Sequence, residues 1–174
     1  MLQPQAPAGF GRSASYGRAI LNKWRHLFID GEYERRERIL SGLTLEQVKR
    51  LPSERSHSIY EELWHAARWQ TIIVERDEEL YETWLRGERY PAHPPEEEAE
   101  WFGLVAEFLS GLEKALECAS SPEKLGVEVD PGVTMRDVLH SLAVHNAYHM
   151  GKIVTVRQMI GVWPPDDSFN RSAD

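Results

Sequence analysis

The chain has little cysteine, with Cys118 as the single thiol among 174 residues. One thiol excludes an intramolecular disulfide framework and a zinc site built from several cysteines. A lone thiol in an acidic chain fits a reducing compartment, so we expect a cytoplasmic protein. Cys118 lies between Glu117 and Ala119 near the end of a predicted helix, and we expect an inert, partly buried side chain.

Long hydrophobic runs are also missing, because no apolar stretch approaches the roughly 18 residues of a membrane-spanning helix. Residues 1–10 are rich in Pro, Ala and Gln and lack the apolar stretch of a signal peptide. We therefore expect no membrane partner. The predicted organisation is a mobile tail over 1–12, one domain over 13–165 and a second tail over 166–174.

Basic charge is in deficit, with 20 Lys and Arg against 28 Asp and Glu and a net charge of −8. The isoelectric point near 5.4 and the absence of a dense Lys/Arg run argue against nucleic acid as a partner. Hydrophobic residues at 41% and charged residues at 28% are typical of a folded domain rather than a disordered chain.

Between clusters of proline and glycine, apolar residues recur every three to four positions over stretches of helical length. Long helices are predicted over 15–30, 58–86, 95–119 and 134–160, and short ones over 33–40 and 44–51. Capping signals support several of these starts, whereas the one strand signal, over 125–129, is weak. We predict an all-α fold, an up-down four-helix bundle with short extra helical turns in its connections. The 87–95 loop is long enough for the chain to cross over.

Three of the seven histidines occupy positions that face the predicted core. His145 and His149 are four residues apart, so both lie on the apolar face of the last helix, and His65 points inward from the second. Neutral imidazoles in such an i,i+4 pair can present two nitrogens to one metal ion. Each histidine could instead be a hydrogen-bonded core residue. Two imidazoles buried without partners would be costly, however, and a metal ion supplies that partner.

Glu62 lies three residues before His65 and has several possible roles. It could be a metal ligand, a base beside the metal, or a solvated charge near the helix start. The Glu-x-x-His spacing also matches di-iron bundles, which need a second copy on another helix. The last helix has Leu142 and Asn146 at the corresponding positions, so a mononuclear site fits better.

Two segments resemble the DinB/YfiT-like superfamily of damage-inducible, metal-binding helical bundles. Residues 57–65, HSIYEELWH, are similar to its HSIxExxxH segment, and residues 140–153, HSLAVHNAYHMGKI, to its LHxxxxHxAYHxGQI segment. Residues 43–47, LTLEQ, also resemble its GLTxEQ turn. The order and spacing agree over roughly residues 15–165.

The resemblance implies one divalent metal per chain, held by His65, His145 and His149 with positions left open to water or substrate. Nickel, zinc, iron and manganese all suit such a site, and imidazole ligands disfavour magnesium and calcium. Lys152 stands where the family commonly has Gln. Its side chain could extend harmlessly into solvent or bind an anionic substrate. Asn146 is expected to pack or hydrogen-bond locally.

Some relatives are implied to use low-molecular-weight thiols such as bacillithiol or mycothiol. Our first hypothesis is a metal-dependent S-transferase that directs such a thiolate to an electrophilic small molecule. Trp69 could line its substrate pocket. A second hypothesis is a non-catalytic, metal-stabilised stress or binding protein, and a third is a hydrolase with Glu62 or a water as base. The resemblance also implies a homodimer.

Overall fold

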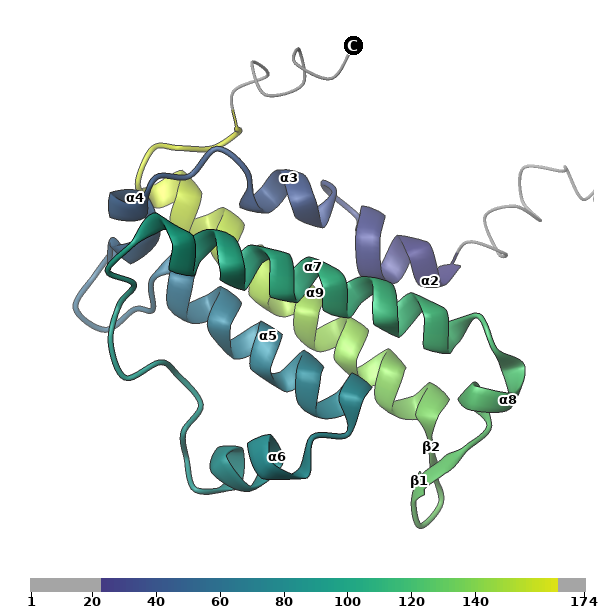
Figure 1. The fold of residues 1–174 in the computed structure, drawn as a ribbon. Coiled ribbons are helices and arrows are strands. Elements are labelled where there is room, and N and C mark those ends of the chain that lie inside the picture. Colours follow the sequence, from purple (N-terminus) through teal and green to yellow (C-terminus); the bar gives the residue numbers. More distant parts are fainter. Residues whose placement is uncertain (1–22, 166–174) are drawn as a thin grey trace, which may run out of the picture.

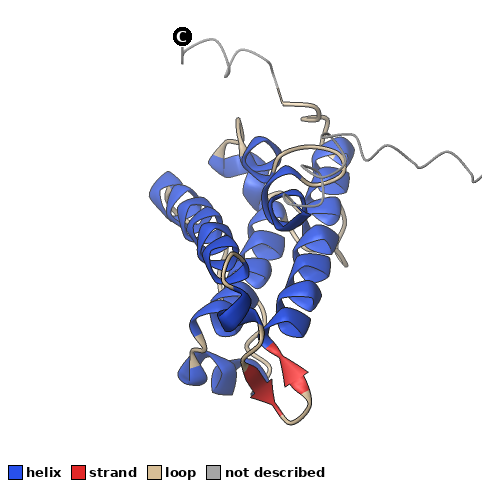
Figure 2. Ribbon diagram, turned by 90° about the vertical axis from the view of Figure 1, so that its right-hand side faces the viewer, coloured by secondary structure: helices blue, strands red, loops and turns tan. Residues whose placement is uncertain are grey.

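The computed structural model describes residues 23–165, and helices dominate it (Figure 1). In chain order the elements are α2 (Lys23–Arg25), the π-helix η1 (His26–Asp30), α3 (Arg36–Leu40), α4 (Leu45–Lys49), α5 (Ile59–Glu75), α6 (Glu78–Leu85), α7 (Glu98–Ala119), α8 (Pro122–Leu125), β1 (Glu128–Asp130), β2 (Val133–Thr134) and α9 (Met135–Met159). The predicted all-α class is confirmed. The two strands form only a small antiparallel hairpin before α9 (Figure 2).

Parts of the predicted outline lie outside the described residues. These parts are the tails over 1–12 and 166–174 and the first half of the helix expected over 15–30. The second half of that helix is present as α2 and η1. The boundaries of the single domain over 13–165 stay a prediction.

The three long helices lie side by side, with α5 packed along both α7 and α9 (Figure 1). Helices α5 and α7 run in the same direction, because Arg68 pairs with Glu107 and, further along both helices, Glu75 pairs with Lys114. Helix α9 runs in the opposite direction (Figure 1). The strict up-down order therefore does not extend to α5 and α7. Helix α6 and the 86–97 segment form the crossover that joins them.

The predicted helix over 58–86 is interrupted. Its start is confirmed, because the Ser58 hydroxyl accepts from the backbone N–H of Glu61, and the Glu61 carboxylate accepts from that of Ser58. Arg76 then ends α5 in the left-handed conformation, with φ of 57°. Asp77 starts α6 by accepting the N–H of Leu80. The N-cap formed by Asp77 thus favours a new helix over continuation of α5. No glycine or proline marks this position in the sequence.

The start of the third long helix is also displaced. It begins at Glu98 rather than directly after Pro95. The Glu100 carboxylate accepts the backbone N–H groups of both Glu96 and Glu97, and this cap fixes the first turn. Capping by a side chain within the first turn thus outweighs the preference of proline for the first helical position.

The helix interfaces are largely apolar, and one buried polar connection joins α5 to both of the other long helices. The Gln70 side chain of α5 donates to the backbone carbonyl of Phe108 in α7 and accepts from the Asn146 amide of α9, each at 2.8 Å. Buried polar groups need such partners. This connection fixes all three helices relative to one another, directly beside His145.

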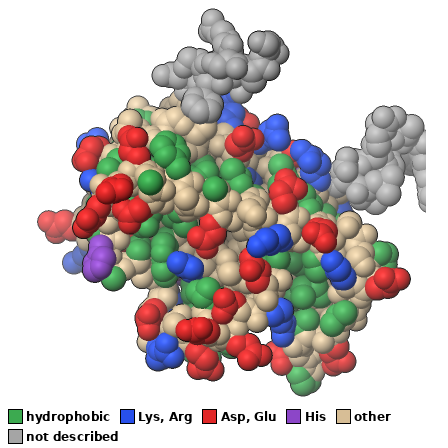
Figure 3. Space-filling model, in the orientation of Figure 1, with side chains coloured by type: hydrophobic (Ala, Val, Ile, Leu, Met, Phe, Trp, Pro, Cys, Tyr) green, Lys and Arg blue, Asp and Glu red, His purple; other side chains and the backbone are tan. Residues whose placement is uncertain are grey.

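The surface carries acidic and basic side chains interspersed, as the face in Figure 3 shows. Within residues 23–165, no helix is both long and apolar enough to cross a membrane.

Candidate metal centre

Three histidines from two helices meet at one point. His65 projects from α5, and His145 and His149 project from α9. One potential ligand atom from each lies within 4.8 Å of the other two. The ring centroids of His65 and His145 are 4.6 Å and 4.5 Å from that of His149. The structure thus brings together all three histidines predicted from the sequence, and the group could hold a metal ion.

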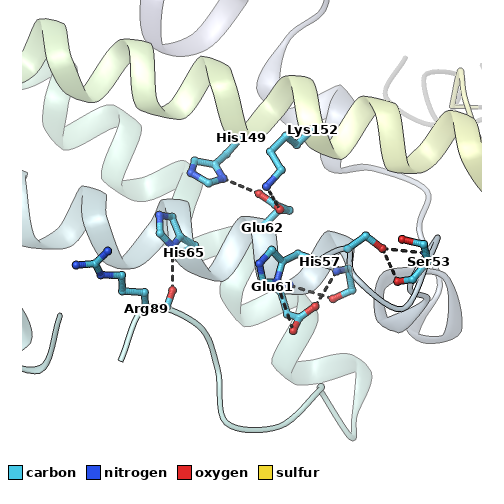
Figure 4. Close-up of polar contacts among 10 residues, drawn as sticks. Ser53, His57, Glu61, Glu62, His65, Arg89, His149 and Lys152 are labelled. Atoms are coloured by element: carbon cyan, nitrogen blue, oxygen red, sulfur yellow. Dashed lines mark hydrogen bonds and ion pairs between the residues drawn. The ribbon is translucent and has the colours of Figure 1, made fainter. Parts of the chain in front are cut away.

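Hydrogen bonds orient two of the three imidazoles. Nδ1 of His65 donates to the backbone carbonyl of Arg89 at 2.9 Å, and Nδ1 of His149 donates to the Glu62 carboxylate at 2.7 Å (Figure 4). Because both acceptors are oxygens that only accept, the hydrogen of each ring resides on Nδ1. Nε2 of each ring therefore keeps its lone pair available for a metal, the arrangement commonly found behind metal-binding histidines.

His145 differs from the other two. Its Nδ1 is buried and has no hydrogen-bond partner in the part of the chain that the structure describes. Leaving a buried polar atom without a partner costs about 1–3 kcal/mol. A metal ion bound at this nitrogen would offset that cost. The donor set and this unpartnered nitrogen therefore fit a borderline transition metal.

Two of the three imidazoles, those of His65 and His145, are kept neutral by their surroundings. Burial lowers the pKa of His65 to about 4, although its bond to the Arg89 carbonyl acts in the opposite direction. Burial also lowers the pKa of His145 to about 4, and the nearby His149 and His65 rings add to the effect. Metal ligation requires neutral imidazole, so both rings are in the ligand form at neutral pH without prior loss of a proton.

Glu62 is neither a solvated charge nor a member of the ligand group among the described residues. Its side chain is 1% exposed, and its two oxygens meet His149 and Lys152. Burial alone would raise the pKa of the Glu62 carboxyl, but the hydrogen bonds from His149 and Lys152 outweigh burial and hold the pKa below its ordinary value. Glu62 is therefore an ionised carboxylate that orients His149.

The interpretation of Lys152 as a harmless outward cation was wrong. Its ammonium pairs with Glu62 and lies 5.4 Å from the centre of the Tyr148 ring. Burial acts to lower the pKa of Lys152, yet the bond to Glu62 outweighs burial and raises it. One third of the side chain stays exposed, so the charged end remains accessible from outside.

Two further predicted residues lie next to His145. Asn146 is fully buried, and its amide bonds across to Gln70 of α5. The Trp69 ring is 6.0 Å from the His145 ring and 5.1 Å from that of Trp84. Trp69 thus belongs to an aromatic wall beside the site, and its role in a substrate pocket stays a prediction.

The sequence reasoning missed the crossover segment that covers His65. The rings of Trp84 and Tyr90 lie 4.6 Å and 4.9 Å from His65, and Tyr90 also stacks on His57 at 3.8 Å. Arg89 supplies the carbonyl described above. Arg89 and Tyr90 lie outside the helices, and the position of all three residues depends on how the chain returns after α5. Two aromatic residues near the Gly87 turn were the one available signal.

The sequence profile of the DinB superfamily matches residues 29–153 of the chain. The match covers most of the chain and contains all three histidines, and the chain therefore belongs to the DinB superfamily. The resemblance carried by the two histidine-bearing segments is confirmed. No curated protein and no solved structure matches the chain.

Proposed function

We propose that this protein is a metal-dependent enzyme whose single divalent transition metal is held by His65, His145 and His149. The observation that carries the proposal is the convergence of three imidazoles without a fourth His, Cys, Asp or Glu in the group, within residues 23–165. Structural metal sites close their coordination with four protein ligands, whereas three-ligand sites leave room for water or substrate. Such a site supports chemistry at the metal.

The reaction that we propose is transfer of a low-molecular-weight thiol to an electrophilic small molecule. A bound divalent metal supplies a lowered thiol pKa and hence a thiolate at neutral pH. In such a transfer the thiol proton would pass to solvent, the sulfur would bond to the electrophilic carbon, and the leaving group would depart with its electron pair.

The chain's own residues prepare the site for this reaction. Glu62 and the Arg89 carbonyl hold two imidazoles in the ligand orientation. Trp84 and Tyr90 place aromatic rings against His65, which would limit the access of water to a bound thiolate.

The hydrolase alternative is less well supported. A general base needs a free oxygen within reach of the attacking water. The Glu62 oxygens are engaged by His149 and Lys152, so the carboxylate orients a ligand instead of accepting a proton. A non-catalytic role remains a second candidate, because a metal bound by His65 and by two residues of α9 would cross-link two helices.

A turnover assay separates the catalytic from the non-catalytic role. Metal-loaded protein is mixed with bacillithiol, mycothiol or cysteine and with 1-chloro-2,4-dinitrobenzene, and the thioether product is followed by absorbance. We expect turnover in the wild type and its loss in His149→Ala. His140→Ala is the matched control, since this histidine is also on α9 but stacks on Trp24 outside the cluster. Full turnover in metal-free His149→Ala would refute the enzyme proposal.

We also infer that the protein forms a homodimer, as the family resemblance implies. The inference is supported by an apolar groove of about 550 Å³ between η1, α3 and α9. Tyr33 and Val144 border it and are 94% and 71% exposed. Large exposed apolar side chains around a groove are a common feature of protein interfaces.

A further inference from the structure

A cavity of about 660 Å³ adjoins the histidine cluster through the Glu62 side chain, which lines the cavity and also bonds His149. One wall is the segment that precedes α5, and the other is the outer surface of α9. In Figure 4 this region lies around Lys152 and His57, on the side of Glu62 away from His65. Tyr148 and Met159 give the cavity apolar surface.

The charged groups of this cavity are mainly cationic. Its charged lining consists of Arg55, Lys152 and Glu62, together with the His57 ring. The Glu62 carboxylate is already used by His149 and Lys152. Arg55 is exposed and has no ion-pair partner in the described part of the chain. A protein with a net charge of −8 thus presents an uncompensated guanidinium in this cavity.

Lys152 provides further hydrogen-bond donors in the cavity that Arg55 also lines. An ammonium group carries three N–H donors, and the bond to Glu62 uses only one of them. Glu62 and the Tyr148 ring hold the ammonium in place, so little side-chain entropy remains to be lost on binding. Glu61 is a further carboxylate near the cavity, because its side chain lies 3.8 Å from the His57 ring.

We propose that this cavity binds a small organic carboxylate, whose anionic end is held by Arg55 and Lys152. The apolar body of the ligand packs on Tyr148 and Met159. None of the three clustered histidines lines this cavity, so the proposal goes beyond the proposed function and does not depend on the metal. Arg55 determines specificity, because a charge-assisted, bidentate hydrogen bond to a carboxylate is stronger than one to a neutral amide.

The test compares two probes of the same shape, 2-naphthoate and 2-naphthamide, by isothermal titration calorimetry on the protein as purified with its metal. We expect the wild type to bind naphthoate about tenfold more tightly than naphthamide. Arg55→Gln should lose most of this preference while keeping its affinity for naphthamide. Arg50→Gln is the matched control, because Arg50 is an exposed arginine at the end of α4 and does not line this cavity.

Metal content, measured on the same samples, separates this inference from the proposed function. A wild type that holds metal but binds both probes equally would overturn the carboxylate site and leave the metal centre intact. The carboxylate site would also be overturned if Arg55→Gln and the wild type showed the same preference for naphthoate over naphthamide. Conversely, a preference for naphthoate that Arg55→Gln removes supports the carboxylate site, even if the protein were found to bind no metal.

Discussion

The Glu62 carboxylate orients His149 and at the same time neutralises Lys152. In Glu62→Gln the amide oxygen still accepts a hydrogen bond but provides no negative charge, and Lys152 loses its counter-ion. We expect metal affinity to fall about 10–100-fold, as for other carboxylates behind metal-binding histidines. Competition with a chromophoric zinc chelator measures this change.

Glu61→Gln is the control for that substitution. Glu61 is the adjacent residue, and its capping bond to Ser58 tolerates glutamine at this position. A Glu62→Gln protein that binds zinc as tightly as Glu61→Gln would contradict the orienting role.

The lowered pKa values of His65 and His145 predict a pH dependence of the metal-free protein. Both fall from 6.5 to about 4 on folding, so the unfolded state binds more protons between these values. The stability that these residues contribute is therefore present above pH 6.5 and is lost as the pH falls towards 4. Urea unfolding of the metal-free protein at pH 7 and pH 5 measures it. If the free energy of unfolding of His145→Gln changed as much between pH 7 and pH 5 as that of the wild type, His145 would not contribute to the pH dependence.

At this scale the sequence reveals the three histidines and singles out Glu62, but it does not reveal which side chains these residues contact. The spacing of His145 and His149 places them on one helical face whatever the rest of the fold does. The bond from Glu62 to His149 joins positions 87 residues apart and appears only when two helices are placed side by side. The same reason hides the Asn146–Gln70 bond and the pairing of Lys152.

At the scale of the elements, α5 approaches α7 closely at Gly111. An added Cβ at Gly111 would overlap the Gln70 amide nitrogen and lie 2.9 Å from its Cδ. Gln70 has no free direction to move in, because it bonds both Phe108 and Asn146. We therefore expect Gly111→Ala to lower the free energy of unfolding by about 1–3 kcal/mol.

Gly103 of the same helix provides the control. An added Cβ there meets nothing within 4 Å, and the residue is exposed. Gly103→Ala should raise the free energy of unfolding by about 0.5–1 kcal/mol, because alanine loses less backbone entropy in a helix. Urea unfolding measures both variants. Equal effects of the two substitutions would contradict the tight contact at Gly111.

Helix starts with side-chain caps are predictable from the sequence, whereas the end of α5 is not. Ser58 and Glu61 predict the start of α5, because the capping box that they form is a local sequence motif. Arg76 adopts a left-handed conformation that arginine rarely favours, and its guanidinium donates to the Val129 carbonyl 53 residues away. A contact at that distance along the chain is not encoded in the local pattern.

On the scale of the whole molecule, the sequence predicts the helical class but not the relative direction of α5 and α7. Hydrophobic periodicity reports which side of a helix is buried and is the same for parallel and antiparallel neighbours. The ion pairs from Arg68 to Glu107 and from Glu75 to Lys114 establish the parallel arrangement. The length of the 87–95 loop allows this crossover without requiring it.

The inferred homodimer makes a prediction at the same scale. Val144→Glu places a charge on the exposed α9 surface beside the apolar groove and should shift the protein from dimer to monomer. Sedimentation equilibrium measures the mass. Val127→Glu is the control, because Val127 is also exposed but precedes the β1–β2 hairpin. A monomeric wild type, or a Val144→Glu protein that remains dimeric, would contradict the proposed surface.

The central claim is that three histidines hold one transition metal in this bundle. The most direct test is the metal content of untagged protein by mass spectrometry, for the wild type, His149→Ala and the His140→Ala control. The account predicts about one transition-metal ion per chain in the wild type and the control, and its loss in His149→Ala. Absence of metal from all three proteins, with no uptake when nickel or zinc is added, would contradict it.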